Sequence, residues 1–415
     1  MSLPAIFGLL GGLLVLAFVA NQVFRHTRVP DVVVLLAAGL LLGPGLGWVE
    51  AAQFEAITQL FGTLAIILIL FEGGLELNLR ETLAHSPGAL VLAVVAYLLS
   101  LGLVTLVLWQ GLGLSVTTAL LGGAVLGCTS SSIVLPVLQQ LEVRQPVKIT
   151  LVLEATLGDV LAVLTVGLLL ELAATGEPDP SRFFLGLLFK IAVSLAFAMV
   201  AGVLWSRLLP VLSEQRFWHV LTFSVVLLLY AVTEAVGASG FIAALGFGLV
   251  LSNVPGIERR LVDTTFGLEA PAEEPHLQIL TFHSELAFLV RTFFFVLIGV
   301  VVKFAALRGR LLLTLGILGA IFLARWLAVK LSRWAWREIY SLGREVILYM
   351  LPRGLITVVL AFQVLEARGS EVAFLPAVAF ATILVTNLIV VFGSVRARRH
   401  ALVSVPAEPA PPPSE

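Results

Sequence analysis

The stretch LEATLGDVL, residues 153–161, places two carboxylates inside a hydrophobic span of roughly 25 residues. A charged side chain at that depth costs several kcal/mol unless another group compensates it, so an acid such as Asp159 indicates a functional site. Two further polar interruptions lie inside apolar segments, the hydroxyl run Thr129–Ser132 and the tripeptide Pro352–Gly354. An acid, a hydroxyl cluster and a cation in three separate membrane helices predict a transport site.

Composition places the chain among polytopic membrane proteins. Of its 415 residues, 59% are hydrophobic and 12% are charged, whereas soluble domains average about 45–50% and about 25%. The single cysteine, Cys128, excludes an internal disulfide and a thiolate metal site. The formal net charge of −1 gives no indication of nucleic-acid binding. We expect no cofactor and no nucleic-acid partner.

Segments that are long and apolar enough to cross a bilayer, roughly 17–25 residues each, number thirteen in this sequence. They cover about residues 5–24, 30–48, 57–77, 88–109, 114–140, 147–172, 183–207, 217–236, 238–253, 280–302, 311–334, 345–366 and 373–394. The division between the eighth and ninth is the narrowest, because only residues 236–238 separate them.

Lysine and arginine are unevenly distributed between alternate loops. One set of loops holds sixteen of them and the other set holds six. Because cytoplasmic loops carry the excess of positive charge, this asymmetry predicts an N-terminus outside and a C-terminus in the cytoplasm. Residues 1–399 are expected to form the transmembrane domain, and the Pro/Ala-rich residues 400–415 a disordered cytoplasmic tail.

The fifth and twelfth predicted spans each contain a polar interruption, and the predicted topology runs them in opposite directions. Paired discontinuous helices of opposite orientation are typical of inverted-repeat transporters with a site near the midplane of the membrane. We therefore expect an all-α polytopic membrane protein of about thirteen helices, two of them discontinuous.

Asp159 is expected to bind a proton and a monovalent cation alternately. Burial favours the protonated acid, whereas a bound cation favours the carboxylate. Since one carboxylate does not readily hold both, competition between them gives exchange. Glu154 lies about 140° away around the same helix, so it is expected to face a different neighbour and to belong to a structural ion pair.

Thr129 and Ser130 are the preferred candidates for further cation ligands. Hydroxyl and carbonyl oxygens suit a hard cation, and hydroxyls also satisfy backbone groups in an unwound stretch. The alternative is that these small residues pack one helix against another.

Arg353 lies in a span that Pro352 and Gly354 are expected to break. At that depth it needs a counter-charge, and Glu154 is its expected partner. Arg325 is a second buried cation with a structural role.

Three other charged positions are of interest. Glu72 and Glu76 lie at the predicted cytoplasmic end of the third span, where they either attract cations into a funnel or simply mark an interfacial helix end. Arg291 is a third buried cation, for which Glu285, six residues earlier, is the expected partner.

Together these motifs resemble the monovalent cation:proton antiporter superfamily, over about residues 5–395. The resemblance rests on Phe71–Glu76 (FEGGLE), Thr129–Ser132, the pair Glu154 and Asp159, Phe293–Gly299 (FFFVLIG), Arg325 and Pro352–Gly354. It implies the sodium/proton antiporter fold, in which two broken helices cross. It also implies a homodimer, in which a dimerisation subdomain and a moving core subdomain are interleaved in the sequence. Asp159 would then be the carrier acid, with Glu154 and Arg353 stabilising the core.

Gly158 departs from the pattern of this superfamily, which usually carries Asn there in electroneutral members and Asp in electrogenic ones. With a single acid left at the site, we predict electroneutral, one-for-one exchange. The crossover at residues 129–132 lacks an acid that many eukaryote-like exchangers carry and resembles the potassium-efflux branch, so Na⁺ and K⁺ are both candidates. Supporting roles are assigned to Gly158, Arg325 and Glu72.

Two other classes of function compete with an antiporter. A symporter or a channel on the same fold would differ in whether protons move against the cation. An intramembrane aspartyl protease is suggested by Leu157–Asp159, but Thr156 stands where a GxGD motif has its first glycine, and no second membrane aspartate completes a dyad. We expect a transporter of the bacterial inner membrane, surrounded by lipid, and not an enzyme.

Overall fold

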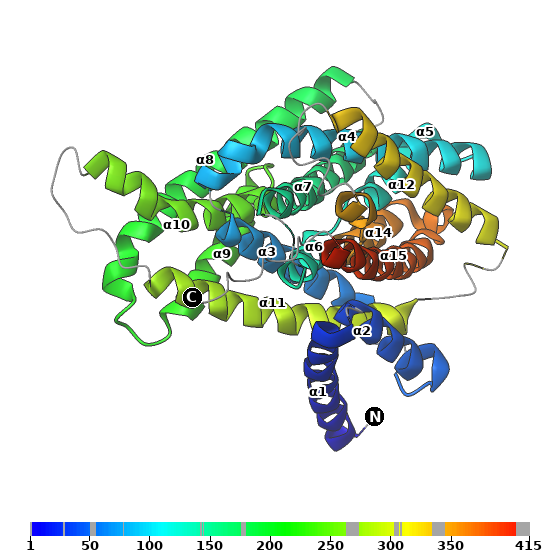
Figure 1. The fold of residues 1–415 in the computed structure, drawn as a ribbon, viewed down its shortest axis with the longest axis horizontal. Coiled ribbons are helices and arrows are strands. Elements are labelled where there is room, and N and C mark those ends of the chain that lie inside the picture. Colours follow the sequence, from blue (N-terminus) through cyan, green and yellow to red (C-terminus); the bar gives the residue numbers. More distant parts are fainter. Residues whose placement is uncertain are drawn as a thin grey trace, which may run out of the picture.

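The computed structural model describes residues 2–27, 30–49, 55–77, 79–141, 143, 145–175, 180–262, 274–302, 307, 309–333 and 345–403. The described chain is helical almost throughout (Figure 1). Its helices are α1 (Leu3–Thr27), α2 (Asp31–Leu40), the π-helical turn η1 (Leu41–Gly45), α3 (Glu55–Glu76), α4 (Leu79–Leu112), α5 (Val116–Gly127), α6 (Ser131–Gln139), α7 (Gln145–Thr175), α8 (Pro180–Leu212), α9 (Trp218–Ala235), α10 (Gly240–Val262), α11 (Glu274–Val301), α12 (Leu311–Leu331), α14 (Leu355–Arg368), the 3₁₀ turn η5 (Gly369–Val372) and α15 (Leu375–Val403).

The helical fold suits an apolar sequence that spans a membrane. Lipid offers no hydrogen-bond partners, so every backbone polar group must find its partner inside the protein, as it does in a helix. Within the described residues, nine helices are long and apolar enough to cross a membrane, and Asp31–Gly45 and Gly240–Asn253 are shorter apolar helices. Each predicted span coincides with one helix or with a broken pair, and the narrow division at residues 236–238 is confirmed. The number of membrane crossings stays a prediction.

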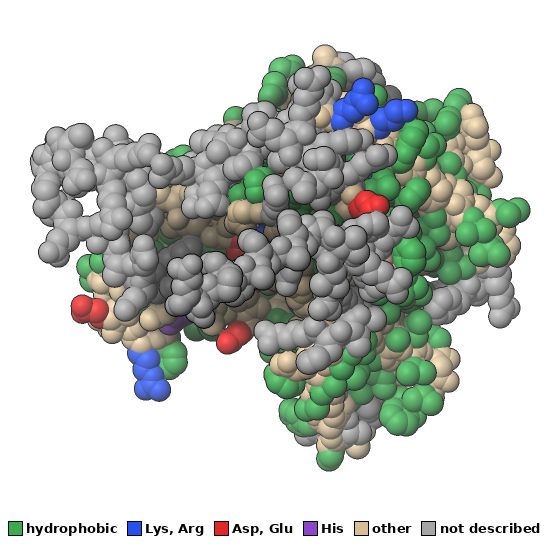
Figure 2. Space-filling model, in the orientation of Figure 1, with side chains coloured by type: hydrophobic (Ala, Val, Ile, Leu, Met, Phe, Trp, Pro, Cys, Tyr) green, Lys and Arg blue, Asp and Glu red, His purple; other side chains and the backbone are tan. Residues whose placement is uncertain are grey.

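The outer surface is apolar where a soluble protein would be polar. Large side chains are exposed on α1 and α12, among them Phe7, Phe18 and Leu312, the last with 84% of its surface accessible. Apolar side chains also cover much of the visible face around α1 in Figure 2. Large apolar side chains exposed in this number are expected of a protein that is embedded in a membrane.

The helices pack as two bundles that alternate along the chain. The outer bundle consists of α1, α2, α3, α8, α9, α10 and α11, and the site bundle of α4, α5, α6, α7, α12, α14 and α15. In Figure 1, α1 and α2 project from one side of the molecule, while α6, α14 and α15 lie near its centre. The bundles touch mainly where α3 and α11 meet α14 and where α7 meets α8. The C-terminal helix continues to Val403, so the expected tail begins within it, and residues 404–415 lie outside the described chain.

Within the outer bundle, α3 and α10 approach so closely that their backbones touch. A Cβ atom on Gly248 would meet the carbonyl of Phe71 and lie 2.9 Å from the backbone nitrogen of Leu75. A Cβ on Gly74 would likewise meet the carbonyl of Leu245. Backbone atoms cannot yield as a flexible side chain can, so this crossing requires glycine on both helices. The second glycine of the FEGGLE segment therefore has a packing role.

We expect Gly248→Ala to lower the thermal stability of the detergent-solubilised protein. Overpacking of this kind costs about 1–3 kcal/mol, and tryptophan fluorescence during heating measures it. Gly319→Ala on α12 is the matched control, because an added methyl group there meets nothing within 4 Å. Equal melting temperatures for the two variants would contradict a backbone contact between α3 and α10.

Candidate functional site

Two helices of the site bundle are broken, as the polar interruptions predicted. Helix α5 ends at Gly127, residues 128–130 are extended, and α6 begins at Ser131. Residues 345–349 are helical, residues 350–354 are not, and α14 begins at Leu355. Each break exposes the N–H or C=O groups of two helix ends, so both breaks need partners from other parts of the chain.

The two breaks supply partners to each other. The backbone nitrogen of Ser130 donates a hydrogen bond of 2.8 Å to the carbonyl oxygen of Pro352. A Cβ atom on Gly354 would collide with the Ser130 side chain, so glycine is required where the breaks cross. The sequence expectation of two crossed discontinuous helices is confirmed.

The peptide groups of Arg353 are held by α15. The nitrogen of Arg353 donates to Thr386 Oγ1 at 3.0 Å, and Asn387 Nδ2 donates to the Arg353 carbonyl at 3.0 Å. Both side chains are fully buried. Sequence reasoning missed Thr386 and Asn387, although a polar pair inside an otherwise apolar span was a usable signal.

Asp159 lies where the first break meets α7, with none of its surface accessible. Its Oδ2 accepts hydrogen bonds from the backbone nitrogen of Ser131 at 3.0 Å and from Ser131 Oγ at 2.6 Å. Ser131 is the first residue of α6, so the carboxylate faces the partially positive end of a helix. Within the described part of the chain, the second oxygen, Oδ1, is buried without a hydrogen-bond partner. The acid is therefore anchored through one oxygen and open at the other.

The hydroxyl that contacts Asp159 belongs to Ser131, whereas Thr129 and Ser130, the two residues favoured as cation ligands, contact other groups. Thr129 Oγ1 lies 3.4 Å from NH1 of Arg353, from which it accepts, and Ser130 Oγ is 2.9 Å from Ser132 Oγ. Gly158 faces the same break, since a Cβ there would lie 3.7 Å from the nitrogen of Thr129. Thr129, Ser130 and Gly158 thus line the surroundings of Asp159, and their part in cation binding stays a prediction.

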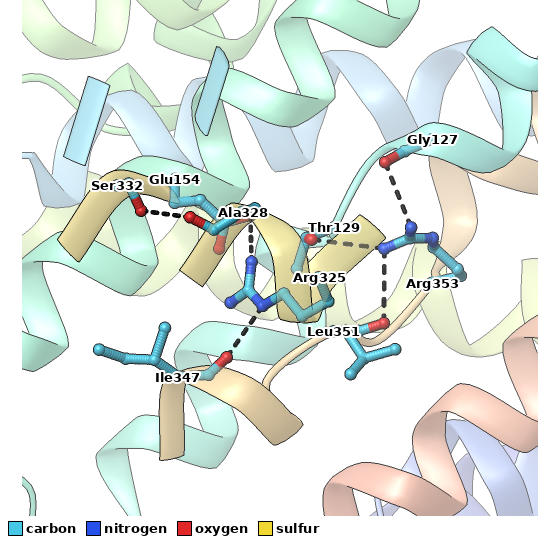
Figure 3. Close-up of polar contacts among 9 residues, drawn as sticks. All are labelled: Gly127, Thr129, Glu154, Arg325, Ala328, Ser332, Ile347, Leu351 and Arg353. Atoms are coloured by element: carbon cyan, nitrogen blue, oxygen red, sulfur yellow. Dashed lines mark hydrogen bonds and ion pairs between the residues drawn. The ribbon is translucent and has the colours of Figure 1, made fainter. Parts of the chain in front are cut away.

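The buried ion pair of Glu154 is formed with Arg325 (Figure 3). Glu154 Oε1 lies 2.8 Å from Arg325 NH1, and only 3% of each side chain is accessible. The contact is an ion pair without the alignment of a hydrogen bond. Arg325 also donates through Nε to the carbonyl of Ile347 at 2.9 Å. The pair therefore joins α7 and α12 to the helical segment that leads into the second break.

The expected pairing of Glu154 with Arg353 is wrong. Arg353 instead donates through Nε to the carbonyl of Leu126 at 2.9 Å. Its NH2 donates to the carbonyl of Gly127 at 3.2 Å (Figure 3). These carbonyls end α5 and carry the partial negative charge of a helix C-terminus. Arg353 is satisfied there mainly by backbone oxygens, which leaves the carboxylate of Glu154 to Arg325.

The remaining charged candidates belong to the outer bundle. Arg291 contacts Asp31 of α2 at 3.5 Å, whereas its expected partner, Glu285, is exposed. Glu72 and Glu76 are half-buried near the end of α3. Among the described residues, Glu76 Oε2 is buried with no hydrogen-bond partner. Attraction of cations by Glu72 stays a prediction.

The sequence that forms these two breaks and the buried aspartate is similar to those of known proteins. Residues 13–397 match the family described as "Sodium/hydrogen exchanger, transmembrane". The chain belongs to the sodium/hydrogen exchanger family. It is 25% identical over 381 residues to "Na(+)/H(+) antiporter 1" of Methanocaldococcus jannaschii, an alignment that covers 88% of this chain and 84% of the relative. It is 30% identical over 332 residues to "K(+)/H(+) antiporter NhaP" of Alkalimonas amylolytica, covering 78% of this chain and 54% of that longer relative.

The fold is that of a solved family member. The structure of the sodium proton antiporter MjNhaP1 from Methanocaldococcus jannaschii, at pH 8, superposes with a TM-score of 0.75. The match covers 97% of this chain and 98% of MjNhaP1, at 21% sequence identity. Shared architecture at this identity establishes the fold, while the roles of individual side chains rest on the geometry described above.

The Glu154–Arg325 pair generates a stability prediction. Removing one partner leaves an uncompensated buried charge at a cost of about 3–5 kcal/mol, whereas replacing both by apolar side chains is often tolerated. We expect Glu154→Met and Arg325→Met each to lower the melting temperature in detergent strongly, and the double variant to be more stable than either. A double variant no more stable than the worse single variant would contradict the pairing.

Proposed function

We propose that this protein exchanges a monovalent cation, Na⁺ or K⁺, for a proton across the membrane, with Asp159 binding the two alternately. The proposal rests chiefly on the position of Asp159. Its carboxylate is fully buried, held through Oδ2 by Ser131 and unpartnered at Oδ1 within the described chain. One oxygen fixes the acid in place, and the other is available for a proton or a cation.

Two opposing electrostatic effects on Asp159 make the proton and the cation compete. The N-terminus of α6 and the two donors of Ser131 stabilise the carboxylate, while burial away from water penalises it. An ionised, empty Asp159 is therefore costly inside the bilayer, and either a proton or a cation removes that cost. Since one free oxygen cannot hold both ligands well, release of one accompanies binding of the other. The oxygens of Thr129 and Ser130 are the proposed additional cation ligands.

The exchange is proposed to be electroneutral, one proton for one cation. Gly158, beside Asp159 on α7, contributes no side chain, and the other nearby acid, Glu154, is committed to Arg325. Curated relatives are named as Na⁺/H⁺ and as K⁺/H⁺ antiporters, so both cations are carried in the proposal. Glu154, Arg325 and Arg353 have structural roles in the site bundle, and Glu72 attracts cations towards it.

The protein is proposed to act as a homodimer in a bacterial inner membrane. The outer bundle is the dimerisation part of a homodimer, and the site bundle is the part that moves. The transmembrane domain spans residues 1–399 in a bacterial inner membrane, with the N-terminus outside and the C-terminus in the cytoplasm, as the loop charges indicate. Lipid covers its apolar exterior. The proposed activity forms and breaks no covalent bond except that to the exchanged proton, so the protein is proposed to be a transporter and not an enzyme.

Asp159→Asn is expected to abolish exchange without unfolding the protein, because the amide can neither ionise nor release a proton. The assay uses everted membrane vesicles from cells that lack their own antiporters. A pH-sensitive dye reports collapse of the proton gradient when Na⁺, Li⁺ or K⁺ is added. Glu171→Gln is the matched control, an acid on the same helix whose side chain is 62% accessible.

Full exchange by Asp159→Asn would refute the role of this acid. Absence of cation-dependent collapse in wild-type vesicles that contain the protein would favour a symporter or a channel instead.

Gly158→Asp is expected to make transport electrogenic by adding a second carboxylate at the site. A Cβ at this position would lie 3.7 Å from the backbone nitrogen and 3.8 Å from the backbone oxygen of Thr129. These are ordinary contact distances, so the Cβ of a new side chain fits without moving residues 128–130. Exchange rates in proteoliposomes, with and without an imposed membrane potential, measure the change. Gly158→Asn, of the same size but neutral, should remain insensitive to the potential. Insensitivity of both variants would contradict the proposed stoichiometry.

A further inference from the structure

The first turn of α6 contains a carbonyl that its own helix cannot satisfy. In an α-helix the carbonyl of Ser132 accepts a hydrogen bond from the N–H of residue 136. Residue 136 is Pro136, inside α6. Proline has no N–H, and its ring pushes against the carbonyl four residues earlier. The Ser132 carbonyl is partly buried, and a carbonyl shielded from water is costly without a donor, so Ser132 needs a donor from elsewhere.

Arg291 of α11 supplies that donor. Its NH1 donates to the Ser132 carbonyl at 3.0 Å. Helix α11 belongs to the outer bundle and α6 to the site bundle, so this hydrogen bond joins the two bundles. It ends one residue from Ser131, which holds the carboxylate of Asp159 through both its nitrogen and its hydroxyl.

The guanidinium is itself oriented by an acid of the outer bundle. Arg291 NH2 lies 3.5 Å from Oδ2 of Asp31, and the two side chains are only 17% and 11% accessible. Asp31 begins α2, where its Oδ1 accepts from the nitrogen of Val32 at 2.9 Å. Glu72 of α3 is also close enough for its charge to attract Arg291. Arg291 is thus held from the α2 and α3 side with one donor group directed at α6.

We propose that Arg291, oriented by Asp31, is a positioning residue that holds the first turn of α6 against Asp159. The proposal rests on the function proposed above for Asp159. It makes the geometry of the cation site depend on the outer bundle: when the bundles shift, the Ser132 carbonyl loses its donor and the first turn of α6 is no longer held. Pro136 is the reason that Arg291 is needed, because without an N–H at position 136 this carbonyl is open to an outside donor.

The test measures cation-dependent exchange by the full chain in proteoliposomes. We expect Arg291→Ala to raise the apparent KM for the cation about tenfold, as for loss of one hydrogen bond from a charged donor, with a much smaller change in the maximal rate. Adding Pro136→Ala to this variant restores an N–H at position 136 within α6. The double variant is therefore expected to recover most of the lost affinity, and Pro136→Ala alone to behave nearly as the wild type.

Either of two results would overturn the proposal. An unchanged KM for Arg291→Ala with only a lower melting temperature would show that Arg291 merely packs the bundles. A raised KM that Pro136→Ala does not restore would show that the Ser132 carbonyl is not the route. Should Arg291→Ala fail to fold, Asp31→Asn is the substitute; it keeps the shape of the acid and should raise the KM in the same direction.

A measurement without transport separates this proposal from the function of Asp159. Hydrogen exchange followed by mass spectrometry should show faster exchange of α6 amides in Arg291→Ala and a return towards the wild type with Pro136→Ala. This result would support the positioning role even if Asp159→Asn still transported. Unchanged α6 exchange in Arg291→Ala would refute it whatever the transport assays showed.

Discussion

The absence of water in a membrane interior is the constraint on which this structure depends. A continuous helix satisfies its own backbone there, but a broken one does not. The site bundle contains two breaks, and each is closed by groups from distant parts of the chain. Arg353 caps the end of α5, Asn387 and Thr386 hold the peptide of Arg353, and Ser130 donates to Pro352. The primary role of these polar residues is therefore to supply hydrogen-bond partners to the backbone at the two breaks.

The proposed ion site follows from the same requirement. A helix that begins inside the membrane presents N–H groups, and at α6 these groups and the Ser131 hydroxyl are met by a carboxylate. The carboxylate satisfies the helix start while keeping one oxygen unused within the described structure. A single arrangement thus completes the backbone of α6 and leaves unpaired the oxygen that is proposed to take a proton or a cation.

The sequence predicted those features that depend on position along one helix. Hydropathy located the spans, and the polar interruptions located both breaks and Asp159. Contacts between helices could not be predicted in the same way, because the spacing of residues along the sequence does not give the distance between two helices. Glu154 had two candidate arginines, and only the packing of α7 against α12 selects Arg325. The contact between Ser131 and Asp159 was not predicted either: because successive residues are turned by about 100° in a helix, the residue at which α6 starts decides which hydroxyl of the run meets Asp159.

The long separation between Glu154 and Arg325 has a consequence for biosynthesis. The two partners, 2.8 Å apart in the folded protein, are encoded about 170 residues apart. At about 5–20 residues per second, the ribosome needs on the order of ten to thirty seconds to make the intervening chain. Four helices of the outer bundle, α8 to α11, are synthesised in that interval. Helix α7 therefore emerges with Glu154 before its partner Arg325 exists, and this acid must wait for α12 before the two charges can be buried together.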